Sequence, residues 1–243
     1  MKVLLAGKNS DAIRGLVESS GLTIVDQNPE VIISFGGDGT LLYSEREYPS
    51  IPKLPVRNSQ FCHKCPEHDE KVLLEKLHQN KLTLKSYRKL QTEVDGKTLY
   101  ALNEFSIRNA HPTHAIRFRI HPPLSFPRKR ESINNLFIGD GIVVSTLFGS
   151  TAYFKSITGK TFDTGFGLAF NNTTEIVEPI FLEKNDEIKF ELVRNIAQLS
   201  SDNNPDIYDL HPGSNLTFNL SDKVTKIYSA ESLRCPNCQV IRG

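Results

Sequence analysis

The sequence predicts an α/β domain followed by an all-β, sandwich-like domain, and two observations lead to this expectation. In the first eighty or so residues, short apolar runs alternate with helical patterns, which is typical of a parallel, Rossmann-like sheet. After Lys81 the apolar residues recur at every second position, which is typical of strands with one wet face. We therefore expect an α/β domain over residues 1–81, completed by the tail 223–243, and a β-rich domain over 82–222.

Within the first domain, the residue pattern predicts an alternation of strands and helices. Caps at Asn9 to Asp11 and a stop at Gly21 delimit the first helix, whose apolar residues fall at helical spacing. A second, polar helix is expected over 69–78. The predicted strands are 2–6, 22–25, 31–35 and 53–56.

Within the second domain, Asp95-Gly96 separates two strand-like runs, 91–94 and 97–102, and predicts a hairpin with a type I′ turn. Period-two alternation predicts further strands at 116–120, 188–192 and 216–220. The segment 121–132 interrupts this pattern with three prolines and the basic triplet Arg128-Lys129-Arg130, and is interpreted as a protruding loop with no catalytic part. A final strand is expected in 223–243.

Composition excludes several functional classes. The 243 residues are 38% apolar and 23% charged, with a net charge of +1, which gives no general attraction to nucleic acid or to a membrane surface. No stretch approaches the roughly 20 apolar residues that span a bilayer. The apolar run after Lys2 is too short for a signal peptide and is better explained as a strand. A cytoplasmic location is expected.

The most informative stretch is Gly36-Gly37-Asp38-Gly39-Thr40, directly behind the apolar run 31–35. Glycines permit a tight turn and close approach of a ligand, and successive amides turned inward form a nest for phosphate. Thr40 is expected to cap a helix that begins at Leu41. An ordinary strand-to-helix turn is the simpler alternative. Three glycines around one acid favour a phosphate site in which Asp38 handles a proton or a metal.

The four cysteines form two C-x-x-C pairs, Cys62 with Cys65 and Cys235 with Cys238. Such pairs in a cytosolic chain favour a tetrahedral zinc site over disulfides. The pairs stand 170 residues apart, so a shared structural zinc ion requires the C-terminus to return to the first domain. Two unrelated pairs, or a redox role, are the alternatives.

Two further stretches carry polar groups suited to a nucleotide. Asn103 and Glu104 follow a β run, and an amide beside a carboxylate can meet both donors and acceptors of a base edge or a ribose. The run from Gly139 to Tyr153 predicts a strand that opens into a hydroxyl-rich turn and then a helix containing Ser156. Amides and hydroxyls there suit a ligand rich in phosphates and hydroxyls, although a capped helix start would look the same.

Taken together, these three stretches resemble the NAD kinase family, whose members phosphorylate the adenosine-ribose 2′-hydroxyl of NAD to give NADP. The resemblance follows the family's order over nearly the whole chain. It implies an NAD kinase fold with a nucleotide-binding first domain and a substrate-binding second domain. It also implies ATP with Mg²⁺ as the donor, a homodimer or homotetramer, and neither nucleic acid nor membrane as a partner.

The resemblance further implies residue roles. Asp38 would be the general base, and the amides of Gly36, Gly37 and Gly39 would hold donor phosphate beside Thr40. Glu104 would face a ribose, and Asp140 would lie near the nicotinamide. The remaining nucleotide contacts would be Asn103, Thr151, Ala152, Tyr153, Ser156 and Asp202, some of them from a neighbouring subunit.

The chain departs from the family pattern at 58–65, at Thr146-Leu147-Phe148 and at 156–159, and 121–132 looks like extra length. A zinc ion could hold the first of these turns in place without its usual glycines. Two alternatives to an NAD kinase therefore stay open: a lipid or small-alcohol kinase of the same superfamily, and a non-catalytic NAD-binding regulator.

Overall fold

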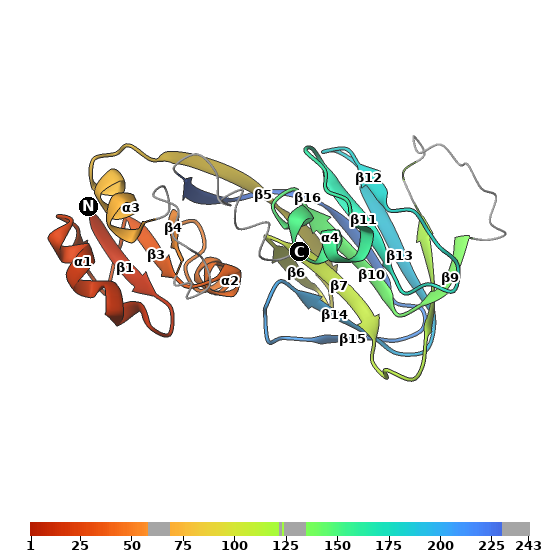
Figure 1. Ribbon diagram of the computed structural model, residues 1–243. Helices are drawn as coiled ribbons and strands as arrows, with labels where there is room; N and C mark the ends of the chain where they lie inside the picture. Colours follow the sequence, from red (N-terminus) through yellow and green to blue (C-terminus); the bar gives the residue numbers. More distant parts are fainter. Residues whose placement is uncertain (58–68, 122, 124–134, 230–243) are drawn as a thin grey trace. The chain divides into compact units, whose positions relative to one another are not determined.

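A computed structural model of the chain describes residues 1–57, 69–121, 123 and 135–229. The chain divides into two compact units. One is Met1–Tyr87 with the chain from Val224 onward, and the other is Arg88–Lys223. The expected order, an α/β part followed by a β part, is confirmed (Figure 1).

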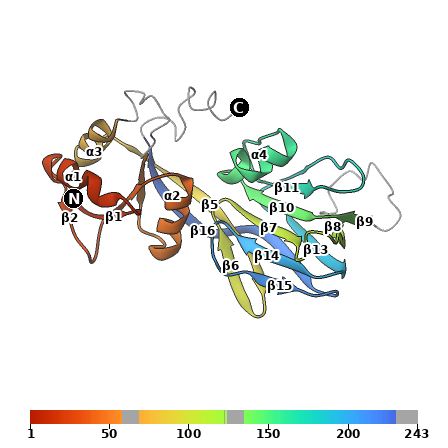
Figure 2. The same cartoon turned by 60° about the horizontal axis from the view of Figure 1, so that its bottom comes forward.

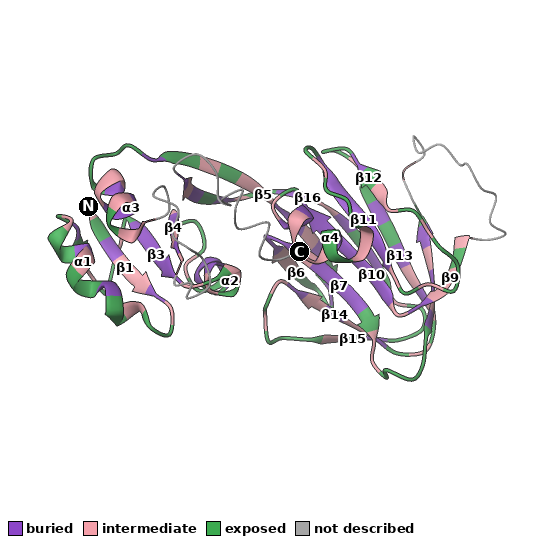
Figure 3. Ribbon diagram, viewed as in Figure 1, coloured by how far each residue is buried: buried purple, intermediate pink, exposed green. Residues whose placement is uncertain are grey.

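The first unit is built on a parallel sheet. Its strands are ordered β2 (Thr23–Ile24), β1 (Lys2–Ala6), β3 (Val31–Phe35), β4 (Lys53–Val56) and β16 (Asn215–Ser229), and each neighbouring pair is parallel. All five residues of β3 are buried (Figure 3), as expected for a central strand of a parallel sheet.

The helices of this unit follow the sequence pattern closely. They are η1 (Ser10–Ile13, a 3₁₀ turn), α1 (Arg14–Ser19), α2 (Asp38–Glu47) and α3 (Glu70–His78). Helix α3 begins where predicted, because the Asp69 carboxylate accepts a hydrogen bond from the amide of Val72 at 3.2 Å. The first helix opens as a 3₁₀ turn, and the predicted strand 22–25 pairs over two residues only.

A buried ion pair fastens α2 to β4. Lys53 is fully buried, and its ammonium pairs with the Glu45 carboxylate of α2 and donates to the carbonyl of Tyr48 at 2.7 Å. A buried charge needs such partners, because desolvation otherwise costs several kcal/mol. The C-terminal end of α2 is thereby held against the start of β4.

The second unit contains two antiparallel sheets. One sheet has the order β12-β11-β10-β7-β14-β15. The other runs β16-β13-β8-β9, with β5 pairing to β16 and β6. The elements are β5 (Thr83–Val94), β6 (Lys97–Ala101), β7 (Glu104–Asn109), β8 (Ile116–His121), β9 (Leu136–Gly139), β10 (Gly141–Thr146), η4 (Gly149–Thr151), α4 (Tyr153–Thr158), β11 (Phe166–Asn171), β12 (Ile180–Leu182), β13 (Glu187–Arg194), β14 (Ala197–Ser201) and β15 (Tyr208–Leu210).

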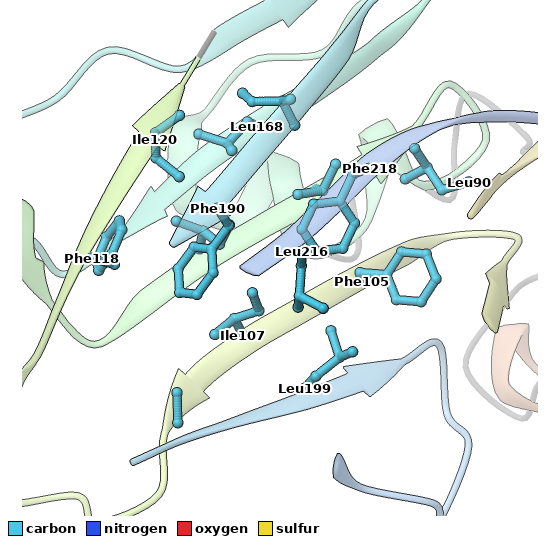
Figure 4. Packing of buried hydrophobic residues seen from close by; sticks show 14 of the residues in the cluster. Leu90, Phe105, Ile107, Phe118, Ile120, Leu168, Phe190, Leu199, Leu216 and Phe218 are labelled. Atoms are coloured by element: carbon cyan, nitrogen blue, oxygen red, sulfur yellow. The ribbon is translucent and has the colours of Figure 1, made fainter. Parts of the chain in front are cut away.

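The inner faces of the two sheets form the main core. Phe105 and Ile107 of β7 meet Phe190 of β13 and Phe218 of β16 (Figure 4), and the Phe105 and Phe218 rings lie 5.5 Å apart. These residues recur at every second position of their strands, so one face of each strand is apolar. The predicted sandwich is confirmed.

Helix α4 covers part of the outer face of the six-stranded sheet (Figure 2). Its fully buried Phe154 packs on Val143 of β10 and Ala169 of β11. This explains why β10 and β11 read as nearly continuous buried runs rather than alternating ones.

The predicted hairpin is confirmed, with Val94 opposite Lys97 and positive φ angles of 50° at Asp95 and 71° at Gly96. The predicted strand 216–220 and the final strand are one element, β16, which has residues in both units. Among the described residues, every helix is too short or too polar to cross a bilayer.

Candidate functional site

In the first unit, the glycine-rich turn links the end of β3 to the start of α2. The amide of Gly36 donates to the carbonyl of Val56 at 2.9 Å. A Cβ at Gly36 would lie 2.2 Å from Oγ1 of Thr40, so this position has no room for a side chain. At Gly37 a Cβ would meet nothing within 4 Å. The first glycine is thus required by packing, and the second leaves the main chain open to a ligand.

A second glycine turn lies beside the first. Gly7 follows β1, has φ of +130°, and a Cβ there would lie 2.3 Å from the carbonyl oxygen of Phe35. Strands β1 and β3 are neighbours, and the order of the sheet reverses between them. In open parallel sheets, ligands bind at the carboxyl edge at such a switch point. The start of the ten-residue helix α2 adds amides and a partial positive charge to this edge.

The Asp38 side chain stands at this edge. Asp38 is the first residue of α2, its side chain is 42% exposed, and its Oδ1 lies 3.5 Å from Nη2 of Arg57, the residue after β4. Phe35 pairs with Val56 in the β3–β4 register, so Gly36 and Arg57 leave adjacent strands at the same level. A solvent-accessible carboxylate and a guanidinium therefore lie together at the switch point.

The prediction that Thr40 caps this helix is wrong. The helix begins two residues before Thr40, at Asp38, with Gly37 as its N-cap in an extended conformation. Thr40 lies in the first turn, and its side chain packs against Gly36 instead. Its carbonyl accepts the Ser44 hydroxyl at 2.8 Å, and Ser44 in turn accepts from Ser34 of β3 at 2.8 Å.

In the second unit, Asp202 holds the chain at Asn103 and Glu104. Its carboxylate accepts three consecutive amides, from Leu102 at 2.8 Å, Asn103 at 2.7 Å and Glu104 at 3.1 Å. The Asp202 amide donates back to the Glu104 carbonyl at 2.9 Å. Both carboxylate oxygens are therefore used on the backbone, and Asp202 fixes the position of the turn at Asn103 and Glu104.

The two acids differ in charge. Burial, and then the nearby charge of Asp202, raises the pKa of Glu104 to about 8. Burial raises the pKa of Asp202 to about 6, while the three amides and the Lys89 charge oppose this rise. At pH 7 Asp202 is ionised and Glu104 holds a proton. Oε2 of Glu104 is buried and has no hydrogen-bond partner within the described part of the chain.

The turn at Asn103 and Glu104 also contacts the hydroxyl-rich segment that begins at Thr146. Oγ1 of Thr146 donates to the Leu102 carbonyl at 2.6 Å and accepts the amide of Gly149 at 3.0 Å. A Cβ at Gly149 would lie 2.3 Å from the carbonyl oxygen of Asn103, so the two segments touch through their backbones. Thr146 belongs to Thr146-Leu147-Phe148, a segment that departs from the family pattern, and its hydroxyl takes part in these hydrogen bonds.

Four predicted nucleotide contacts follow directly from Gly149. Thr151 ends η4, Ala152 joins it to α4, and Tyr153 and Ser156 lie in α4. The Ser156 hydroxyl donates to the Tyr153 carbonyl at 2.8 Å. These four residues therefore follow, by two to seven positions, the glycine that touches Asn103.

Asp140 lies at the other end of the same sheet, between β9 and β10. Its carboxylate accepts from Nδ2 of Asn172 at 2.9 Å and from Nδ2 of Asn109 at 3.4 Å. It lines a cavity of about 410 Å³ together with Arg108 and residues of β14. Because β7 spans six residues, Asp140 and Glu104 mark opposite ends of one strip of sheet.

The predicted residues therefore form two groups, one in each unit. The glycine turn with Asp38 belongs to the first unit, and the residues from Asn103 to Asp202 belong to the second. The four cysteines of the predicted zinc site lie outside the described residues, as do nearly all of 121–132. Sequence reasoning missed Arg57 and Arg108. Arg57 could have been found by aligning the ends of the adjacent strands 31–35 and 53–56.

No protein-family model matches the chain. An NAD kinase 2 of Bacillus cereus is 31% identical over 163 residues, which are 61% of this chain and 56% of that protein. The chain thus spans little more than half the length of the curated relatives it matches.

Two solved structures have the same fold. An NAD kinase from Archaeoglobus fulgidus in complex with ATP has a TM-score of 0.74 at 17% identity, covering 95% of this chain and 94% of that one. A yeast NADH kinase complexed with NADH has a TM-score of 0.77 at 13% identity, covering 99% and 85%. The predicted fold is confirmed.

Proposed function

We propose that the chain, which is similar to NAD kinases in sequence and in fold, transfers a phosphoryl group from ATP to the 2′-hydroxyl of the adenosine ribose of NAD, giving NADP and ADP. The observation that carries this proposal is the accessible Asp38 carboxylate at the glycine-lined switch point of the parallel sheet. A carboxylate there can take a proton from an attacking hydroxyl, while amides beside it suit a phosphate.

In the proposed reaction, the ribose oxygen forms a bond to the γ-phosphorus as the bond from that phosphorus to the bridging oxygen of ADP breaks. The hydroxyl proton passes to Asp38. The amides of Gly37 and Gly39 hold donor phosphate, whereas the amide of Gly36 already donates to the Val56 carbonyl. Arg57 offers a cation to the same phosphate. Mg²⁺ accompanies the donor and offsets its charge, as in other phosphoryl transfers.

We assign substrate binding to the second unit. The neutral Glu104 carboxyl can both donate to and accept from a ribose hydroxyl, and Asn103 offers an amide to the same nucleotide. Thr151, Ala152, Tyr153 and Ser156 would surround the adenine. The hydrogen bonds of Asp202 to three amides support a positioning role for this residue.

The experiment is an assay of the full chain with Mg-ATP and either NAD or NADH, measuring the phosphorylated product. Asp38→Asn should lower kcat by about 10²–10⁴-fold, the usual contribution of a general base. Asp26→Asn, an exposed acid of the same unit, is the matched control. Tight NAD binding without product would favour a regulator, and product formed only from a lipid or other small alcohol would favour a different kinase. Full turnover by Asp38→Asn would refute the assigned base.

Further features remain proposals. We propose a structural zinc ion held by Cys62, Cys65, Cys235 and Cys238, because two C-x-x-C pairs match its preferred ligands. Such thiolates need a reducing compartment, which suits the cytoplasm. Metal analysis of reduced protein should find one zinc per chain, and a stoichiometry near zero would remove the site. We also propose a homodimer or homotetramer, to be checked by analytical ultracentrifugation.

A further inference from the structure

A polar cavity lies between the β5–β6 hairpin and the first residues of β16, and none of its residues has a role in the proposed reaction. It has a volume of about 500 Å³ and lies wholly within the second unit. Apart from Gly96, every lining residue has a polar side chain. The hairpin contributes Thr92, Glu93 and Asp95 among others, and β16 contributes Asn215, Thr217 and Asn219.

The cavity begins where a side chain joins β5 to β16, two strands that pair in one sheet (Figures 1 and 2). The Arg88 guanidinium of β5 donates to the carbonyls of Ser221 at 2.9 Å and Leu220 at 3.2 Å in β16. From this point β5 continues to 91–95 and β16 runs back to 215–219, and these two segments supply most of the lining. The cavity therefore follows the edge of β5 that is turned toward β16.

Two carboxylates give this cavity a negative charge. Glu93 and Asp95 are both exposed, and within the described residues neither forms an ion pair or a side-chain hydrogen bond. The lining contains no Lys, Arg or His side chain that could neutralise them. An anionic ligand would be repelled here, and a cation would be attracted.

Basic side chains on the neighbouring strands have other partners or another direction. Lys189 of β13 pairs with a glutamate of its own strand at 3.1 Å. The Lys223 ammonium lies 4.2 Å from the ring centroid of Tyr100 on β6. Lys97 precedes the lining residue Thr98, and successive side chains of a strand point to opposite faces. The charge of the cavity is thus left for a ligand.

Thr92 gives independent evidence for a missing hydrogen-bond partner. It lines the cavity but is only 2% exposed, and its hydroxyl oxygen is buried without a partner in the described part of the chain. An unpaired buried hydroxyl is destabilising, and a donor that enters from the cavity would satisfy it. Because Thr92 alternates with Gln91 and Glu93, both faces of β5 border the cavity.

We propose that this cavity binds an aliphatic diamine or polyamine, with one ammonium group on Glu93 and another on Asp95. An ammonium group has only donors, and the lining offers carboxylate, hydroxyl and amide oxygens as acceptors. Nδ2 of Asn215 donates to the Gly213 carbonyl at 2.8 Å, which leaves its side-chain oxygen as one of these acceptors. Glu93 and Asp95 are two residues apart, which is about 7 Å of extended chain and suits the two nitrogens of a short diamine.

The same features argue against a bare metal ion. A single ion would fill little of the 500 Å³, and the described residues do not bring three His, Cys, Asp or Glu side chains together. The absence of aromatic rings from the lining likewise favours a linear hydrophilic ligand over a flat ring.

The test titrates the full chain with butane-1,4-diamine, butylamine or MgCl₂ in the absence of nucleotides, by calorimetry and by NMR of backbone amides. The diamine should bind saturably, more tightly than butylamine, and shift the amides of 91–98 and 215–219. Its affinity should fall as KCl concentration rises, because the carboxylates are exposed.

The variants remove one acceptor at a time. Asp95→Asn preserves the hairpin, because Asn-Gly suits the same turn, and Glu93→Gln keeps the size of the side chain. Each should weaken diamine binding by about two- to fivefold, the effect of one exposed ion pair, and reduce the advantage over butylamine. Thr92→Val should raise the melting temperature of the free chain and also weaken the diamine. Glu175→Gln, an exposed acid of the same unit outside the cavity, is the matched control.

Three results would overturn the inference: no saturable binding of the diamine, equal affinities for the diamine and butylamine, or equal effects of Glu93→Gln and Glu175→Gln. Mg²⁺ that shifts the same amides while the diamine does not would also overturn it, in favour of a metal site. Because no nucleotide is present, these outcomes leave the proposed phosphoryl transfer untouched. That reaction stands or falls with the assay of Asp38→Asn.

Discussion

The guanidinium of Arg57 lies 3.5 Å from the Asp38 carboxylate. Arg57 follows strand β4, and Asp38 begins helix α2 three residues after the neighbouring strand β3 ends. Both side chains are partly exposed, at 25% and 42%. An exposed pair of this kind contributes about 0–1 kcal/mol to stability. Its significance lies in placing a cation next to the proposed general base and the glycine turn.

Replacing Arg57 by Gln should therefore affect donor binding more than folding. We expect KM for ATP to rise about five- to tenfold, because a charge-assisted hydrogen bond to phosphate is lost. The melting temperature and the affinity for NAD should stay near those of the wild type. Steady-state kinetics with ATP varied at saturating NAD measures this effect. Arg14→Gln, which removes the exposed ion pair with Asp11, is the control. An unchanged KM for ATP would exclude Arg57 from donor binding.

Asp202 should be a strong determinant of stability in the second unit. Asp202→Ala leaves three amides without their acceptor, and we expect a loss of about 2–3 kcal/mol, or a fall in melting temperature of roughly 4–12 °C. Asp202→Asn keeps one carbonyl oxygen as an acceptor, and asparagine tolerates the positive φ of 48° at this position. Its melting temperature should therefore lie between those of the wild type and Asp202→Ala. Thermal unfolding measures the order.

The exposed Asp206→Ala serves as the control for Asp202, because its side chain carries none of these contacts. NAD affinity should follow the same order as stability, since the three amides position Asn103 and Glu104. If Asp202→Ala bound NAD as tightly as the wild type, the positioning role would be wrong.

Glu104 makes stability depend on pH in a direction opposite to that of an ordinary salt-bridged acid. Burial raises its pKa from 4.5 to about 8, so the folded chain keeps a proton that the unfolded chain releases. The folded state therefore binds more protons, and stability falls as pH rises through this window. Asp202 acts in the same direction only up to about pH 6.

We expect the melting temperature of the wild type to fall between pH 6 and pH 8.5 more steeply than that of Glu104→Gln, which cannot ionise. Glu93→Gln, an exposed acid on β5, should keep the wild-type slope. Scanning calorimetry across this range compares the three. Parallel curves for wild type and Glu104→Gln would mean that Glu104 is ionised in the folded chain.

The two glycines after β3 should tolerate substitution differently. Gly36→Ala places a Cβ 2.2 Å from the Thr40 hydroxyl, and overpacking of this kind costs about 1–3 kcal/mol. Gly37→Ala meets nothing within 4 Å and serves as the matched variant. In denaturant unfolding, Gly36→Ala should have a lower free energy of unfolding than Gly37→Ala. Equal stabilities would show that the turn opens readily around Gly36.

Local signals predicted much of the fold. Asp95-Gly96 specified its hairpin because two consecutive positive φ angles suit this pair, and Asp69 marked the start of α3 through its own side chain. The Thr40 cap failed because Gly37, already extended, could begin the helix two residues before Thr40. Competing caps within one turn differ by too little for residue preference to decide between them.

The sequence by itself determined most strands and helices of the first domain, the hairpin at Asp95-Gly96, the order of the two domains and the residues that carry the family resemblance, since these depend on neighbours a few positions apart. It did not predict the strands β7, β9, β11, β12, β14 and β15. Three contacts could be known only from the tertiary structure. Asp202 accepts hydrogen bonds from amides about 100 residues away, Arg57 pairs with Asp38, and Arg108 lines the same cavity as Asp140. Such contacts follow from which strands pair and in what register. Local sequence propensity does not predict strand pairing or register, because the register depends on burying apolar faces from distant parts of the chain.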